Sequence, residues 1–134
     1  MRNPNNVFHL AIPTHNLDVA EDFYCGNLGC RLARRYDDRI TLDFFGDQLV
    51  CHLNPEKCWP EDVTIYPFHA GITFYEREDF DSFLDLCRQQ ELDFYAEPFC
   101  RFGGTNAEHM SFFLRDPSNN LLEFKWYINS DMMY

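Results

Sequence analysis

The chain has 134 residues, and its 22 acidic against 11 basic side chains give a formal net charge of −11. Hydrophobic residues make up 46% of the chain and aromatic residues 17%, which is enough for a core and argues against intrinsic disorder. Phosphate backbones and anionic membranes repel such a chain, so we expect neither nucleic acid nor a membrane as a partner. The absence of a long apolar run and of a secretory signal predicts a cytoplasmic protein. The length predicts a single domain over residues 1–134.

The cysteines point to packing rather than to disulfides or zinc. Their number is even, but without a secretory signal we expect the reduced state. No two are spaced C-x-x-C, which removes the usual pattern of a zinc knuckle. We therefore expect small buried side chains at the six positions Cys25, Cys30, Cys51, Cys58, Cys87 and Cys100.

The first half of the chain predicts the element order β-α-β-β-β. Large apolar residues alternate over 7–13, which is the period of a strand, and Asn16 can cap a helix that ends near Gly26 and Gly29. Three strand-like runs separated by turn residues follow, over 31–36, 39–45 and 48–53. We define this first module as about 7–54.

The second half repeats that order after a proline-containing linker at about 55–67. The second module, about 68–128, has a strand over 69–75, a helix with apolar spacing near 80–87, and strands near 93–101, 109–115 and 121–127. The dipeptide Phe-His opens both modules, at Phe8-His9 and at Phe68-His69. The repeated order and the matching dipeptides indicate an internal duplication.

Three side chains with metal-binding chemistry lie on the less apolar faces of their predicted strands. They are His9, His69 and Glu123, and we expect all three to face one shared cavity. Two imidazoles and one carboxylate form a facial triad, which binds a divalent metal and leaves other positions open. The alternative for each histidine is a hydrogen-bonded core residue, whereas a carboxylate in mid-strand is costly to bury without a partner.

The Phe8–Ile12 and His69–Ile72 strand starts, and above all the segment Phe112–Phe124 with its Asp-Pro-Ser-Asn-Asn turn, resemble the vicinal oxygen chelate superfamily. That superfamily contains glyoxalases, extradiol dioxygenases and bleomycin resistance proteins. The resemblance covers about residues 7–127. It implies an α+β fold in which two paired β-α-β-β-β modules form an incomplete barrel around a divalent metal. It also implies that His9, His69 and Glu123 are the metal ligands.

One position departs from the pattern of glyoxalase-like members, which take a fourth ligand from the last strand of the first module. Val50 stands opposite Glu123 in the alignment of the modules, and valine cannot bind metal. Gln48 and His52 share its strand parity, so either is open as a fourth ligand. Three ligands without a clear fourth resemble the dioxygenase site more closely, which favours Fe or Mn, with Zn or Ni still open.

Further candidate catalytic residues carry a weaker signal. They are His52, His109 and Lys125: a neutral imidazole can act as a general base, and the lysine lies two residues beyond Glu123 on the same face. The alternatives are surface, loop-edge or cavity-rim residues.

The leading hypothesis is a metal-dependent enzyme of the vicinal oxygen chelate type. Its substrate would be a small oxygen-rich molecule, and the aromatic side chains favour a flat or aromatic one. The competing hypothesis is a non-catalytic ligand-binding protein that resembles the bleomycin resistance members and uses the same cavity without a metal. A third is a structural or protein-interaction domain. The tail 129–134 is compatible with packing in a homodimer, although its composition does not decide the oligomeric state.

Overall fold

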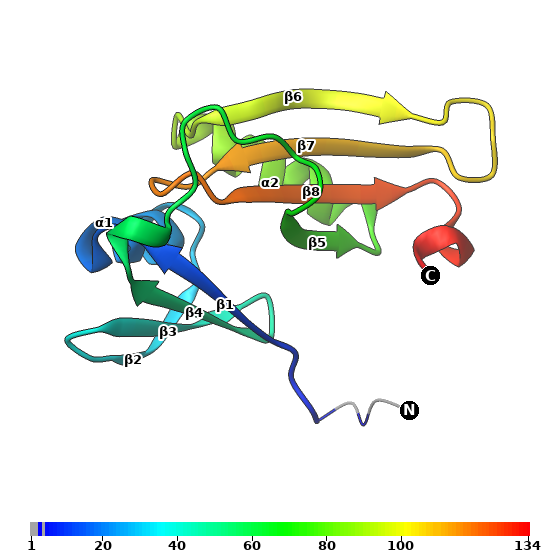
Figure 1. The fold of residues 1–134 in the computed structure, drawn as a ribbon. Coiled ribbons are helices and arrows are strands. Elements are labelled where there is room, and N and C mark those ends of the chain that lie inside the picture. Colours follow the sequence, from blue (N-terminus) through cyan, green and yellow to red (C-terminus); the bar gives the residue numbers. More distant parts are fainter. Residues whose placement is uncertain (1–2, 4) are drawn as a thin grey trace. The chain divides into compact units, whose positions relative to one another are not determined.

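The computed structural model describes residue 3 and residues 5–134, which fall into two compact units. The first unit holds the chain up to Glu61 together with the turn Pro117–Asn120, and the second holds Asp62–Asp116 and Leu121–Tyr134. Each unit contains one four-stranded mixed sheet with helical turns against one face (Figure 1). Within the described chain, no helix has the length and apolar character needed to cross a membrane.

The sheet of the first unit has the strand order β1-β4-β3-β2. Strand β1 runs parallel to β4, and the other neighbours are antiparallel. The elements are β1 (His9–Thr14), α1 (Leu17–Glu21), a π-helical segment (Asp22–Asn27), β2 (Arg31–Arg35), β3 (Arg39–Phe44), β4 (Asp47–Leu53) and a 3-10 turn (Pro55–Lys57).

The helix of the first unit begins where the sequence predicts it and changes form before its end. The Asn16 side chain accepts hydrogen bonds from the backbone N–H groups of Asp18 and Val19, which caps α1. From Asp22 the helix widens into the π segment, and at its end the Leu28 N–H donates to the Phe23 carbonyl, five residues back. The expectation of one uninterrupted α-helix is therefore corrected here.

The second unit repeats the topology, with the strand order β5-β8-β7-β6 and β5 parallel to β8. Its elements are β5 (Ala70–Phe74), α2 (Arg77–Gln89), β6 (Phe94–Arg101), β7 (His109–Arg115), β8 (Leu121–Tyr127) and a 3-10 turn (Ser130–Met133). The α+β class and the twofold β-α-β-β-β order predicted from the sequence are thus confirmed. The exact module limits stay a prediction.

Each sheet buries one face against its own helix. In the second unit Phe83 of α2 packs on Phe124 with ring centroids 4.7 Å apart, and Phe80 packs on Phe112 at 5.5 Å. In the first unit Tyr24 packs edge-on against Phe44. Because strand side chains alternate, every second residue lies on the opposite side, which we call the helix-distal face.

The turn Pro117–Asn120 is held by side-chain hydrogen bonds within the first unit. Ser118, which is 3% exposed, accepts the backbone N–H of His15 at 3.0 Å, and its Oγ lies 3.1 Å from the Thr14 hydroxyl. The Asn120 amide donates to the Pro13 carbonyl at 3.0 Å. The turn Pro117–Asn120 is therefore held by β1 and by His15, the residue that follows β1.

Candidate metal centre

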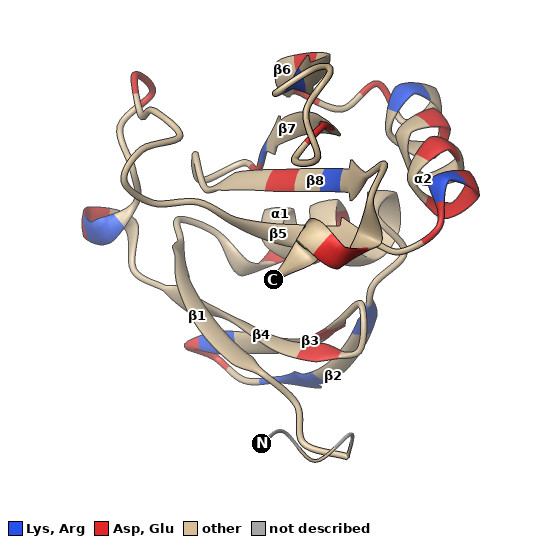
Figure 2. Ribbon diagram, turned by 90° about the vertical axis from the view of Figure 1, so that its right-hand side faces the viewer, with Lys and Arg blue, Asp and Glu red and all other residues tan. Residues whose placement is uncertain are grey.

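The helix-distal face of the second sheet carries the chemistry-bearing residues of that unit. On β8 this face holds Glu123, Lys125 and Tyr127, alternating with the core residues Leu122 and Phe124. Figure 2 shows an acidic band followed by a basic band on β8, and the strand has one residue of each kind. A carboxylate and an ammonium group are thus placed two residues apart on one face.

Glu123 is buried and fully engaged. Its residue is 6% exposed, and its Oε1 accepts a hydrogen bond from the Ser111 hydroxyl at 2.8 Å. Its Oε2 lies 3.2 Å from His69 Nε2 and 3.4 Å from Lys125 Nζ. The partner required by a buried mid-strand carboxylate is therefore present, as a hydroxyl, an imidazole and an ammonium group.

His69 has one ring nitrogen whose protonation state follows from its partner. It lies immediately before β5, not inside the predicted strand, and its Nδ1 is 2.7 Å from the Ile65 carbonyl oxygen. A carbonyl oxygen can only accept, so Nδ1 carries the proton. In the neutral ring Nε2 is then a bare acceptor directed at Glu123. This tautomer, anchored by a second contact, is the one that metal-binding histidines adopt.

Gly71 lets the backbone of β5 approach β8 at the position of Glu123. The two residues are partners in the parallel ladder. A Cβ atom built on Gly71 would lie 1.7 Å from the Glu123 carbonyl oxygen and 2.6 Å from its carbonyl carbon. Both atoms belong to the backbone and cannot rotate away. Any side chain at position 71 therefore forces Glu123 to shift.

The His69–Glu123 pair fits a divalent ion. Two ligand atoms about 2.1 Å from one ion are separated by about 3 Å when they occupy adjacent corners of an octahedron. The observed separation of 3.2 Å between Nε2 and Oε2 is close to that value. Imidazole and carboxylate are also suitable donors for Fe, Mn, Zn and Ni. The donor set and its spacing thus match the expected cofactor.

His9 lies in the other unit, at the start of β1, and is exposed. The ladder pairs it with Gln48, and the next residue on the same face, Ala11, with Val50. Val50 thus occupies in the first sheet the position that Glu123 has in the second. Across the described residues, no three His, Cys, Asp or Glu side chains gather into one cluster. His9 as the third ligand stays a prediction.

The structure separates the remaining candidate residues. Gln48 is the ladder partner of His9, whereas His52 pairs with Pro13, is exposed and lies four residues farther along β4. Of the two proposed fourth ligands, Gln48 is therefore nearer to His9 along the sheet. Lys125 contacts Glu123 directly, as described above.

His109 has the contacts of a packed ring. It is 4% exposed, its Nδ1 lies 2.8 Å from the Ala107 carbonyl, and its ring centroid is 4.5 Å from that of Tyr127. Its rung of the ladder is four residues from that of Glu123 along β7, or about 13 Å. These contacts support a packing role more than proton transfer at the His69–Glu123 pair.

Cys30 and Cys87 are poor metal ligands at neutral pH. All six are free. Burial, followed by the nearby Cys25 and Asp43, raises the pKa of Cys30 to about 12, and burial raises the pKa of Cys87 to about 12. Since metals bind the thiolate, a thiol that stays protonated is a poor ligand.

Two groups that serve this site were not identified from the sequence. Ser111 precedes two phenylalanines on β7, and its rung of the ladder is two residues from that of Glu123; its place on the same face of the sheet was the available signal. The Ile65 carbonyl lies in the predicted linker, where the backbone contributes the contact and no side-chain pattern marks it.

The family model described as Glyoxalase/Bleomycin resistance protein/Dioxygenase superfamily matches residues 6–124. A crystal structure of a glyoxalase/bleomycin resistance protein/dioxygenase from Alicyclobacillus acidocaldarius is 59% identical and covers all of both chains, with a TM-score of 0.95.

Two more distant similarities were found. The genomically encoded fosfomycin resistance protein FosX from Listeria monocytogenes is 12% identical, covering 96% of this chain and 98% of its own, with a TM-score of 0.71. It shows similarity of fold alone. Glyoxalase domain-containing protein RDO1 from Mycosarcoma maydis is 24% identical over 119 residues, 89% of this chain. The chain spans 66% of the length of that relative.

Replacing Gly71 with alanine should lower the free energy of unfolding by about 1–3 kcal/mol, because the new methyl group overlaps the Glu123 backbone. Urea denaturation measures this change. Gly26→Ala is the matched control: no atom lies within 4 Å of its added Cβ, so its stability should stay the same or rise slightly. Equal stability of the two variants would show that β5 does not need its close approach to β8.

Proposed function

Because the chain belongs to the glyoxalase/bleomycin resistance protein/dioxygenase superfamily, we propose that it is a metal-dependent enzyme of the vicinal oxygen chelate type. His69 and Glu123, with His9 as the third ligand, would hold a divalent ion. The substrate would be a small molecule with adjacent oxygens. The ion supplies Lewis acidity, which polarises the substrate oxygens.

The observation that supports the proposal is the contact between His69 Nε2 and Glu123 Oε2. When the imidazole carries its single proton on Nδ1, Nε2 and the Glu123 carboxylate present lone pairs to each other at 3.2 Å. Two acceptors at that distance repel unless a proton or a metal ion lies between them. A divalent ion satisfies both groups and removes the need to protonate His69.

The surrounding residues hold this pair in place and favour a flat substrate. The Ile65 carbonyl sets the tautomer and ring orientation of His69, and Ser111 fixes the second oxygen of Glu123. Aromatic rings stand beside the imidazole: Phe113 has its centroid 5.4 Å away and Tyr66 6.3 Å away. Such rings pack well against an aromatic or conjugated substrate.

Within the superfamily we favour dioxygenase-like over glyoxalase-like chemistry. Two imidazoles and one carboxylate leave three positions of a six-coordinate ion open, and Val50 offers no fourth donor. This ligand set also favours Fe or Mn over Zn or Ni. An oxygen-electrode assay with Fe(II)-loaded protein and catechol should show oxygen uptake that zinc-loaded protein lacks. No uptake with any catechol, together with isomerisation of a thiol adduct of methylglyoxal, would favour the glyoxalase-like alternative.

Metal titration of chelator-treated protein tests the site itself. Mn(II) should bind near one equivalent, and His9→Ala, His69→Ala and Glu123→Gln should each weaken binding by at least about tenfold, because each removes a ligand. Glu97→Gln, which alters a surface carboxylate of β6 that pairs with Arg88, should bind like the wild type. Wild-type protein that takes up no Mn, Fe, Zn or Ni would contradict the proposal.

A specific contact favours the second candidate, a ligand-binding protein that uses no metal. Lys125 Nζ lies 3.4 Å from the same Glu123 oxygen that faces His69. The ammonium group neutralises the buried carboxylate without an ion. In this alternative the aromatic face of the sheet holds a ligand by packing alone.

Lys125→Met separates the two candidates. If the carboxylate is a metal ligand, removing the competing cation should tighten Mn(II) binding several-fold, because the repulsion between the ammonium group and the ion is lost. If the ammonium group is the true partner of Glu123, the same variant should lose stability without gaining metal affinity. Calorimetric titration and urea denaturation of the one variant provide both measurements.

A further inference from the structure

Basic residues are concentrated on one hairpin of this acidic chain. Four of its 11 lysines and arginines fall between positions 31 and 39. Three of the four are paired: Arg31 with Asp43, Arg39 with Asp38, and Arg35 with Asp18 and Glu21. Arg34 has no carboxylate partner in the part of the chain that the structure describes. Its charge remains available to a ligand.

A β-bulge directs Arg34 to the helix-distal face of the first sheet. The ladder pairs Arg31 with Asp43 and Leu32 with Leu42, and after an irregularity at Ala33 it pairs Arg34 with Thr41. The extra residue puts Arg34 on the same side as Arg31, although the two are three positions apart. Without the bulge, alternation would place Arg34 on the side of the core residue Leu42.

Arg34 lines a cavity of about 170 Å³ together with Thr41 and Gln48. Thr41 is 3% exposed, and its hydroxyl has no hydrogen-bond partner among the residues described. The Thr41 hydroxyl borders the cavity, where a ligand can reach it. Arg34, Thr41 and Gln48 together offer a guanidinium, a hydroxyl and an amide to one small space.

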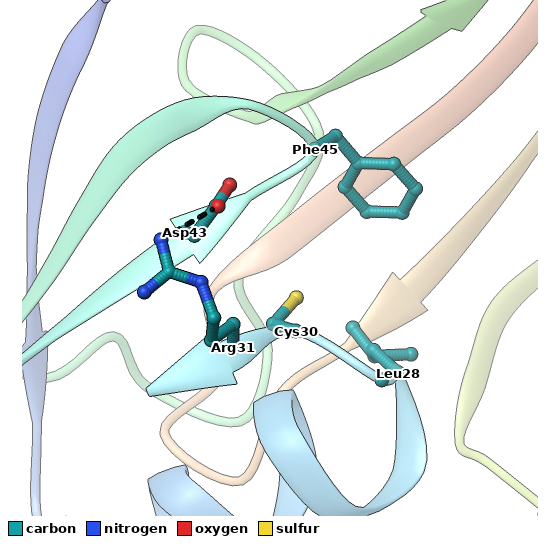
Figure 3. Close-up of a pocket in the computed structure, with 6 residues that line it drawn as sticks. Leu28, Cys30, Arg31, Asp43 and Phe45 are labelled. Atoms are coloured by element: carbon teal, nitrogen blue, oxygen red, sulfur yellow. Dashed lines mark hydrogen bonds and ion pairs between the residues drawn. The ribbon is translucent and has the colours of Figure 1, made fainter. Parts of the chain in front are cut away.

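The acidic residues of the same cavity are already engaged. Asp43 pairs with Arg31 at 3.1 Å, as Figure 3 shows, and also accepts the Gly46 N–H at 2.9 Å. Asp47 accepts the Phe8 N–H at 2.6 Å. The neighbouring cavity in Figure 3 contains Cys30, whose pKa of about 12 leaves a neutral thiol. Arg34 therefore supplies the cationic group that is still free to bind a ligand.

We propose that the cavity lined by Arg34, Thr41 and Gln48 is a binding site for the oxyanion group of a small ligand. A planar guanidinium matches a carboxylate or a phosphate group in shape and charge, and the hydroxyl and amide add donors. The volume is below that of pockets for drug-sized ligands, about 300–1,000 Å³, so the site fits a small acid group.

The place of the cavity in the sheet connects it with the proposed chemistry. Gln48 is the ladder partner of His9, so the cavity and the predicted third ligand share one strand pair and one face. We assign the oxyanion bound in this cavity to the substrate of the proposed enzyme, and only this step rests on the proposed function. The substrate is then a small acid with further oxygens that can bind the metal.

Binding of inorganic phosphate and of acetate to metal-free protein tests the site. NMR shift titrations should show saturable shifts at Thr41 and Gln48 with at least one of the two anions, and none with neutral acetamide. The anion that binds more tightly identifies the group recognised. Arg34→Gln should weaken binding about tenfold or more, and Arg34→Lys should restore part of it, because lysine keeps the charge without the planar fork.

Two further variants exclude a merely electrostatic or structural effect. Arg39→Gln removes an equal charge from the same hairpin, but from a residue outside the cavity, and should leave affinity within about twofold of the wild type. Thr41→Val should weaken anion binding, because it removes a donor from the cavity, while leaving the thermal midpoint of the ligand-free protein close to that of the wild type.

The proposal is overturned if neither anion binds saturably, if Arg39→Gln weakens binding as much as Arg34→Gln, or if Thr41→Val lowers the midpoint without affecting binding. Because the titration uses metal-free protein, its result is independent of the metal titration. Failure of one leaves the other interpretable.

Discussion

The buried carboxylate of Glu123 is the constraint on which the second unit depends. A charge that is 6% exposed must be balanced, and β8 places it where a histidine, a lysine and a serine reach it from three directions. The close approach at Gly71 sets the position of the carboxylate backbone. The Ile65 carbonyl, the His69 imidazole, the Glu123 carboxylate and the Ser111 hydroxyl thus form one connected set of contacts.

The same sheet topology carries different chemistry in the two units. Both pair their first and last strands in parallel, but Val50 takes in the first sheet the position that Glu123 has in the second. The first sheet instead presents an exposed histidine and a cavity lined by Arg34, which has no carboxylate partner among the described residues. Repetition of a fold thus provides two related faces with different side chains, to which we have assigned the proposed metal and anion sites.

Strand alternation, turn residues and the Phe-His repeat were sufficient to predict the fold class, because these signals are local and occur twice. The structure brings His69 Nε2 to 3.2 Å from Glu123 Oε2, while the role of the two residues as metal ligands stays a prediction. The Ile65 carbonyl and the Ser111 contact were not predicted, since neither a backbone acceptor nor a lone serine has a sequence signature. The face of the sheet on which Arg34 lies depends on a β-bulge, because the extra residue reverses the alternation of side chains after it. The alternation of apolar residues in the sequence does not reveal such a bulge. The π-helical turns after Glu21 were missed for a similar reason, because their apolar spacing resembles that of an α-helix.

We have proposed that His69 Nε2 and Glu123 Oε2 bind one divalent ion, while His69 Nδ1 stays protonated and donates its hydrogen bond to the Ile65 carbonyl. Nitrogen-15 NMR of imidazole-labelled protein during a titration with diamagnetic Zn(II) tests it directly. The Nε2 resonance of His69 should move to a metal-bound shift at about one equivalent, and Nδ1 should remain protonated. Imidazole signals of His69 that stay unchanged through saturating zinc would contradict it.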